Sequence, residues 1–139
     1  MYNNLQNKTA IITGASHGIG MEIGRKFLSA GANVVFTDYA KFDLKSLISG
    51  ISTESGSAHS FYGNMKDKLA VNNLIATTLN KFENVDILVN ASRTIISSNP
   101  LDEKEEALEK SLSQNLIATL SVSQLFAKTV IKQTKNRKN

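Results

Sequence analysis

Apolar residues fall along this chain in two alternating kinds of segment. Short runs of consecutive apolar residues, such as Ala10 to Ile12 and Val34 to Phe36, are typical of strands that are buried on both faces of a sheet. Between these runs lie longer segments in which apolar residues recur every three or four positions, as they do on one face of a helix. The alternation predicts an α/β fold, in which helices cover both faces of a parallel sheet.

Four strands and the first two helices follow directly from this pattern. The expected strands are Thr9 to Thr13, Asn33 to Asp38, His59 to Gly63 and Asp86 to Val89. The first helix follows a glycine-rich turn and ends at Ser29-Ala30-Gly31, where glycine suits the left-handed position after a helix. A short second helix is expected over Asp43 to Ile51.

Two longer helices complete the prediction. Asp67 can cap the third helix, whose buried stripe consists of Val71, Leu74, Ile75, Thr78, Leu79 and Phe82. The last helix follows Pro100 and begins with the acidic residues that a helix N-terminus prefers, namely Asp102, Glu103, Glu105 and Glu106. Its apolar stripe is expected to run through Leu108, Leu112, Leu116, Thr119, Val122, Phe126 and Val130. No repeat or linker divides the chain, so one domain over residues 1–131 and a basic tail over 132–139 are expected.

The composition is that of a globular protein, and the absence of cysteine fits a reducing compartment. The chain has 139 residues, of which 41% are hydrophobic and 20% are charged. No apolar run approaches the roughly 20 residues of a membrane-spanning helix, so no membrane partner is expected. The N-terminus lacks the basic and apolar regions of a secretory signal, and there is no cysteine. A cytoplasmic location follows as the expectation.

The net charge of +4 does not indicate nucleic-acid binding. Lys132, Lys135, Arg137 and Lys138 supply four of the 16 basic residues, and the remaining 12 balance the 12 acidic residues. The excess charge is therefore confined to the end of the chain and is not interleaved with aromatic residues. A metal site is not expected either, because His17 and His59 have no further ligand-type residue at ligand spacing.

Candidate chemistry begins at the stretch TGASHGIG, which places Gly14, Gly18 and Gly20 directly after the first strand. Glycines in such a turn let the backbone approach a ligand, while the free N–H groups of the following helix face an anion such as a pyrophosphate. Asp38 stands at the end of the second strand, where a carboxylate can accept hydrogen bonds from an adenosine ribose and would repel a 2′-phosphate. The alternative interpretation is a tight turn and an unrelated surface aspartate.

TGASHGIG resembles the T-G-x-x-x-G-x-G fingerprint of the short-chain dehydrogenase/reductase family. In the same order along the chain, DILVNAS at 86–92 resembles the family segment D-I-L-V-N-N-A-G, and NMKD at 64–67 resembles D-V-x-D. Asn115-Leu116 is similar to the family's N-L pair. The resemblance implies a Rossmann-type, doubly wound parallel sheet that is truncated here after about four strands and four helices. It also implies NAD(P)-dependent hydride transfer on a small alcohol or ketone.

Carried over position by position, the resemblance implies a set of cofactor contacts. Those to the phosphates and their ribose would come from Gly14, Ser16, His17, Gly18, Ile19 and Gly20. Asp38 would hold the adenosine ribose, Asn64 and Met65 the adenine, and Asn90 with Ala91 the inner ribose. Asn64 replaces the usual aspartate, and Ser92 or Arg93 replaces a glycine that lies beside the cofactor.

The expected cofactor is NAD rather than NADP. Relatives that prefer NADP usually carry a basic residue just before the second glycine of the fingerprint. Here that residue is His17, and an imidazole is mostly neutral near pH 7. Together with Asp38, this residue favours NAD.

The family's reacting groups are a serine on the fifth strand and a Y-x-x-x-K pair on the following helix, all beyond the position of Asn115. This chain ends at Asn139, and its tyrosines are Tyr2, Tyr39 and Tyr62. Tyr62 has a lysine four residues later, but we expect it at the end of a strand, where that spacing does not place both side chains on one helix face. Asn115 is the one match to a catalytic-type position, since in the family it supports a proton-relay water.

The sequence leaves three interpretations open. In the first, the chain is the N-terminal half of an NAD-dependent dehydrogenase or reductase, which by itself is inactive and would act on a small-molecule substrate if completed. This interpretation predicts an unpaired edge at the fourth strand, and a homo-oligomer could form through that edge or through the last helix. The second is a non-catalytic protein that binds a nucleotide or a partner, and the third is a degenerate remnant.

Overall fold

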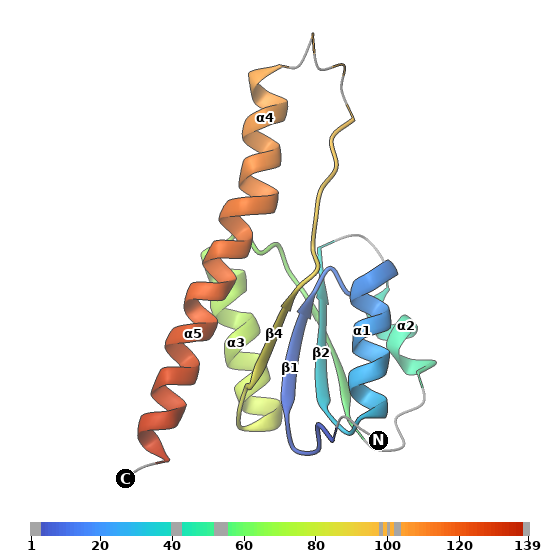
Figure 1. Cartoon of the computed structure of the whole chain (residues 1–139), viewed down its shortest axis with the longest axis vertical. Helices are drawn as coiled ribbons and strands as arrows, with labels where there is room; N and C mark the ends of the chain where they lie inside the picture. Colours follow the sequence, from blue (N-terminus) through green and yellow to red (C-terminus); the bar gives the residue numbers. More distant parts are fainter. Residues whose placement is uncertain are drawn as a thin grey trace.

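A computed structural model describes residues 4–39, 43–51, 56–97, 99, 101 and 104–137 of the chain. Its centre is a parallel four-stranded sheet with the strand order β3-β2-β1-β4 (Figure 1). The strands are β1 (Thr9–Thr13), β2 (Asn33–Asp38), β3 (Ala58–Tyr62) and β4 (Ile87–Asn90). The predicted α/β class is confirmed: the first two strands match their predicted bounds, and the other two differ by one residue at each end.

Helices cover both faces of this sheet. Alternate strand residues point to opposite sides, so both faces present apolar residues that the helices bury. On one face, Ile12 and Phe36 pack with α1 (Gly18–Ser29) and α2 (Leu44–Ser49). On the other face, Ile11 and Val35 pack with α3 (Lys68–Phe82) and α5 (Ala118–Asn136). Figure 1 shows the two helix pairs on either side of the strands. The core is therefore split into two apolar layers, one under each pair of helices.

The third helix forms as its sequence predicts. The Asp67 carboxylate accepts a hydrogen bond from the Leu69 N–H at 2.8 Å and so caps α3. The predicted stripe faces the core: Val71, Leu74, Ile75 and Thr78 are buried, and Leu79 and Phe82 are partly buried.

The last predicted helix forms as a helical segment that contains a π-helical turn, and the first three positions of its predicted stripe are not buried. The segment consists of α4 (Glu105–Leu112), a π-helical turn η1 (Ser113–Ile117) and α5. Leu108, Leu112 and Leu116 are 52%, 48% and 57% exposed, whereas Val122 is 1% exposed. Glu105 and Glu106 begin α4 as predicted, and Asp102 and Glu103 lie outside the described residues.

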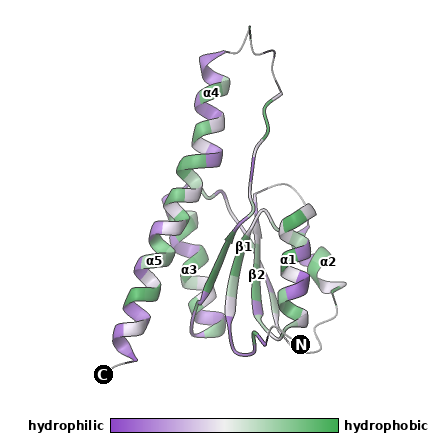
Figure 2. Ribbon diagram, viewed as in Figure 1, coloured by the Kyte–Doolittle hydropathy of each residue, from purple (hydrophilic) through white to green (hydrophobic). Residues whose placement is uncertain are grey.

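Leu108, Leu112 and Leu116 are exposed because the helical segment is longer than the strands of the sheet. A helix over residues 105–136 is roughly 48 Å long, whereas a six-residue strand spans about 20 Å. The helical segment therefore extends beyond the end of the sheet, and α4 has no sheet surface to cover (Figure 1). Figure 2 shows that apolar residues nevertheless recur along α4.

The segment expected as a basic tail begins within helix α5. Helix α5 continues through Asn136, so residues 132–136 are part of the folded helix. Gln133 binds the backbone of Val85, which ties this end of the helix to the sheet. Lys138 and Asn139 lie outside the described residues. No helix in the described part of the chain has the length and apolarity needed to cross a membrane.

Candidate functional site

The turn between β1 and α1 needs its glycines. Gly14 and Gly18 have φ angles of 63° and 56°, in the left-handed region that favours glycine. A Cβ on Gly14 would lie 2.6 Å from the backbone N of Ser92, and a Cβ on Gly20 would lie 2.4 Å from the carbonyl oxygen of Gly14. The turn therefore packs against the chain that leaves β4, and the start of α1 packs against the turn.

Thr13 joins the ends of β1 and β4. Its hydroxyl oxygen accepts hydrogen bonds from the backbone N–H groups of Ala91, at 3.2 Å, and Ser92, at 3.3 Å. These bonds hold the segment after β4 beside the glycine turn. Sequence reasoning did not select Thr13 as a site residue, although its place at the head of TGASHGIG was a signal that could have identified it.

Hydrogen bonds from Ser16 and Tyr39 orient the carboxylate of Asp38. Oδ2 accepts from the backbone N–H of Ser16 at 3.1 Å and from the Ser16 hydroxyl at 2.5 Å. Oδ1 accepts from the N–H of Tyr39 at 2.7 Å. The Ser16 hydroxyl also lies 2.8 Å from Nδ1 of His17. The structure thus brings together three residues that the sequence singled out, and it gives Asp38 a defined orientation beside the glycine turn.

An open groove of about 320 Å³ runs along this turn. It is lined by Gly14, His17, Gly18, Ile19, Gly20, Ile23, Asp38, Val89, Asn90, Ala91, Ser92 and Arg93. The N-terminus of α1 opens into the groove with no acidic residue in its first turn and no side-chain cap from His17. Free helix N–H groups and the positive end of the helix dipole suit an anionic ligand there.

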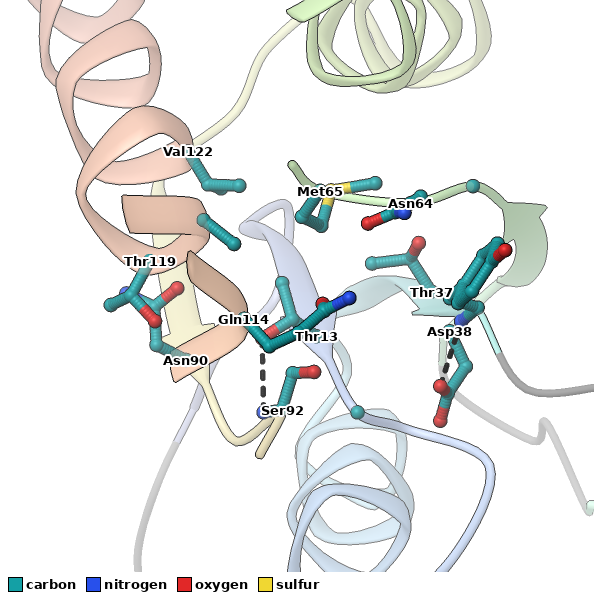
Figure 3. A pocket seen from close by; sticks show the side chains of 14 residues that line it. Thr13, Thr37, Asp38, Asn64, Met65, Asn90, Ser92, Gln114, Thr119 and Val122 are labelled. Carbon is teal, nitrogen blue, oxygen red and sulfur yellow. Dashed lines mark hydrogen bonds between the residues drawn. The ribbon is translucent and has the colours of Figure 1, made fainter. Parts of the chain in front are cut away.

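A second, smaller pocket of about 30 Å³ adjoins the groove and shares Gly14, Asp38, Asn90 and Ser92 with it. The predicted residues Asn64 and Met65 line this pocket (Figure 3). So do Thr37, Gln114, Thr119 and Val122, which sequence reasoning missed. No local signal marks these four residues as a group, because only the packing of η1 and α5 against the strand ends brings them together. The Thr37 hydroxyl is buried without a hydrogen-bond partner among the described residues.

Asn115 lines neither pocket. Its Oδ1 accepts from the N–H of Thr94 at 2.7 Å, and its Nδ2 donates to the carbonyl oxygen of Thr94 at 2.8 Å. This pair of bonds attaches the extended segment after β4 to the π-helical turn. In this structure the side chain of Asn115 therefore positions the backbone of Thr94.

Tyr62 and Lys66 do not share a helix face. Tyr62 is the last residue of β3, and Lys66 precedes the first residue of α3. The Tyr62 ring lies beside that of Tyr39, with the centroids 6.3 Å apart. Among residues 4–39, 43–51, 56–97, 99, 101 and 104–137, no three histidine or acidic side chains gather as a metal site would require.

A parallel sheet with helices on both faces and a glycine turn after its first strand defines a Rossmann-like fold. The family model described as short chain dehydrogenase matches residues 8–137, and the chain belongs to that family. Its relatives include a short chain dehydrogenase/reductase, dpmpG, from Macrophomina phaseolina, which is 32% identical over 134 residues. A 2,3-dihydro-2,3-dihydroxybenzoate dehydrogenase from Bacillus subtilis is 27% identical over 124 residues.

Solved structures of the family have the same fold. A short chain dehydrogenase from Burkholderia cenocepacia, solved in complex with NADP, matches 91% of this chain with a TM-score of 0.82 and 29% identity. One from Mycobacterium smegmatis matches 88% of this chain with a TM-score of 0.81 and 25% identity.

The chain is shorter than the proteins that it matches. The alignment to the Macrophomina protein covers 95% of this chain and 77% of that relative. The alignment to the Bacillus enzyme covers 89% of this chain and 48% of the enzyme. The two structural matches cover 52% and 51% of their chains. The chain thus spans about half the length of most of these proteins.

Proposed function

We propose that this chain is the cofactor-binding part of an NAD-dependent oxidoreductase, which transfers hydride between the nicotinamide and a small alcohol or ketone. The observation that carries the proposal is the mouth of the groove, where the N-terminus of α1 opens beside the carboxylate of Asp38. One end of such a groove suits a pyrophosphate and the other suits a ribose diol. The NADP complex of the Burkholderia relative supports binding of a nicotinamide cofactor.

In this proposal, different residues of the groove and of the adjoining pocket bind different parts of the cofactor. The glycine turn, with Ser16, His17 and Ile19, holds the phosphates and their ribose. Asp38 holds the adenosine ribose, Asn64 and Met65 the adenine, and Asn90 and Ala91 the inner ribose. NAD is preferred because a 2′-phosphate would lie against the negative charge of Asp38.

For the 139-residue chain by itself we expect binding without turnover. Proton transfer to a carbonyl oxygen needs an acid within hydrogen-bond reach of the substrate. Tyr62 lies at the end of β3, next to Asn64 and Met65, the residues predicted to bind the adenine. The side-chain amide of Asn115 is hydrogen-bonded to the backbone of Thr94. A mixture of the chain with NAD and a panel of small alcohols should therefore form no NADH.

Calorimetric titration with NAD and NADP tests the proposal. The chain should bind NAD more tightly than NADP, and Asp38→Ala should weaken NAD binding and reduce the difference between the two. Gly18→Ala should also weaken the binding of both nucleotides, because a side chain strains the left-handed backbone of the turn at this position, where φ is 56°. Gly50→Ala is the matched control, since Gly50 has a φ of −85° and a Cβ there would meet only the Leu47 oxygen at 3.9 Å. A folded chain that binds neither nucleotide would overturn the proposal.

A second candidate function is partner binding, including self-association. Strand β4 lies at one edge of the sheet, and Leu108, Leu112 and Leu116 form a half-exposed apolar stripe on α4 and η1. An open strand edge and an apolar helix face both favour association. Sedimentation of the wild-type chain and of a Leu112→Glu variant would separate a discrete oligomer from a monomer. An insoluble or protease-sensitive product would instead support a degenerate remnant.

The cysteine-free sequence is compatible with the cytoplasm, which is the location we propose.

A further inference from the structure

Arg93 directly follows residues that are fixed against the glycine turn. The backbone N–H groups of Ala91 and Ser92 both donate to the hydroxyl oxygen of Thr13. A Cβ on Gly14 would lie 2.6 Å from the backbone N of Ser92, so the two backbones are in close contact. This part of the chain belongs to no helix or strand, and these contacts hold the backbone that leads into Arg93 in place beside the turn.

The side chain of Arg93 brings positive charge to the groove. Arg93 is exposed, and it is the one lysine or arginine among the described residues that line the groove. A guanidinium stays charged throughout the ordinary pH range, so its charge does not depend on its surroundings. No acidic side chain in the described part of the chain forms an ion pair with Arg93. Its charge is therefore available to a ligand in the groove.

The rest of the groove does not supply enough positive charge for a pyrophosphate. The free N–H groups at the N-terminus of α1 are equivalent to about half a positive charge. The carboxylate of Asp38 also lines the groove, and a positive charge on His17 would do no more than offset it. Each of the two phosphates of a dinucleotide is negatively charged. The guanidinium of Arg93 adds a full positive charge, and its planar fork of donors matches phosphate oxygens.

We propose that the guanidinium of Arg93 binds the pyrophosphate of the dinucleotide, together with the glycine turn and the N-terminus of α1. The inference rests on the proposed function, because it concerns how the same groove holds its cofactor. The alternative role of Arg93 is steric, in which a long side chain takes up part of the groove and leaves less room for a ligand. The two roles predict opposite changes in affinity when the side chain is removed.

Titration of NAD into Arg93→Ala separates the two roles. Affinity should fall about tenfold or more, the loss expected for a hydrogen-bonded charge. Arg93→Lys keeps the positive charge without the planar fork and should retain part of the affinity. Arg25→Ala is the matched control, because Arg25 is an exposed arginine of α1 that pairs with Glu22 and does not line the groove. An affinity that is unchanged or higher in Arg93→Ala overturns the inference.

ADP-ribose identifies the part of the cofactor that Arg93 contacts. This compound keeps the adenosine, the pyrophosphate and the second ribose of NAD but lacks the nicotinamide. Arg93→Ala should therefore weaken ADP-ribose and NAD by the same factor. A loss of affinity for NAD alone would place the guanidinium at the nicotinamide and overturn the inference.

Salt dependence distinguishes a charge contact from a general disturbance of the groove. The affinity of the wild-type chain for NAD should fall more steeply with rising salt than that of Arg93→Ala, because ions screen an exposed charge contact. Equal salt dependence in the two chains would make the effect of the substitution structural and overturn the inference, while NAD binding itself would stand. Failure of the wild-type chain to bind either NAD or NADP overturns the proposed function instead.

Discussion

Gln133 on α5 makes two hydrogen bonds to the backbone of Val85. The Val85 N–H donates to Oε1 of Gln133, and Nε2 of Gln133 donates to the Val85 carbonyl oxygen, both at 2.9 Å. Val85 is fully buried and lies two residues before β4. A side chain of the helix therefore pairs with the chain entering the sheet as a neighbouring strand would, and it anchors the end of α5.

Removing this amide should destabilise the fold. Gln133→Ala leaves a buried N–H and a buried carbonyl of Val85 unpaired, which is expected to lower the free energy of unfolding by about 1–3 kcal/mol. Gln124→Ala is the control, because Gln124 is an exposed glutamine of the same helix. Urea unfolding of both variants measures the difference, and equal stabilities would show that the Val85 bonds contribute nothing.

Gly24 allows α1 to lie against the ring of Phe36. A Cβ at this position would lie 2.2 Å from Cε1 of Phe36, a residue that is fully buried. Gly24→Ala should therefore cost about 1–3 kcal/mol by overpacking the core. Adding Phe36→Leu should recover part of this loss, and Gly50→Ala, where a Cβ would meet only the Leu47 oxygen at 3.9 Å, should cost little. A stable Gly24→Ala variant in thermal unfolding would contradict the close packing.

Asn115 should hold the segment after β4 in place without contributing to nucleotide affinity. Asn115→Ala removes both bonds to the backbone of Thr94, so hydrogen exchange at the Thr94 N–H should accelerate about fivefold or more. Asn72→Ala is the comparison, since Asn72 bonds the backbone of its own helix on an exposed face. NAD affinity should change little, because Asn115 lines neither pocket. Unchanged exchange at Thr94 would contradict the positioning role.

Stability should depend on the protonation of His59. Burial lowers the pKa of His59, and the positive charge of Lys81 lowers it further. The unfolded chain therefore binds this proton more readily than the folded one, and stability falls as pH falls through the unfolded pKa of about 6.5. His59→Gln should flatten this part of the curve in unfolding measurements between about pH 8 and pH 5. An identical pH dependence in the variant would show that His59 does not contribute.

The elements that local sequence defines were predicted. The apolar runs of β1 and β2, the cap at Asp67 and the glycine turn after β1 depend on residues close together in the chain. Gly14 illustrates this, because its left-handed φ follows from its place between a strand and a helix. Backbone preferences, caps and the period of burial act over a few residues, so the order of residue types determines them.

Tertiary structure decided what lies against each surface. Leu112 and Val122 belong to the same helical stripe in the sequence, yet one is 48% exposed and the other 1%, because the sheet ends before the helix does. Gln133 reaches Val85 across 48 positions of the chain, and Ser16 reaches Asp38 across 22. Periodicity shows that a face is apolar, and residue type shows that a group can bond, but the covering surface and the partner depend on contacts between segments that are distant in the sequence.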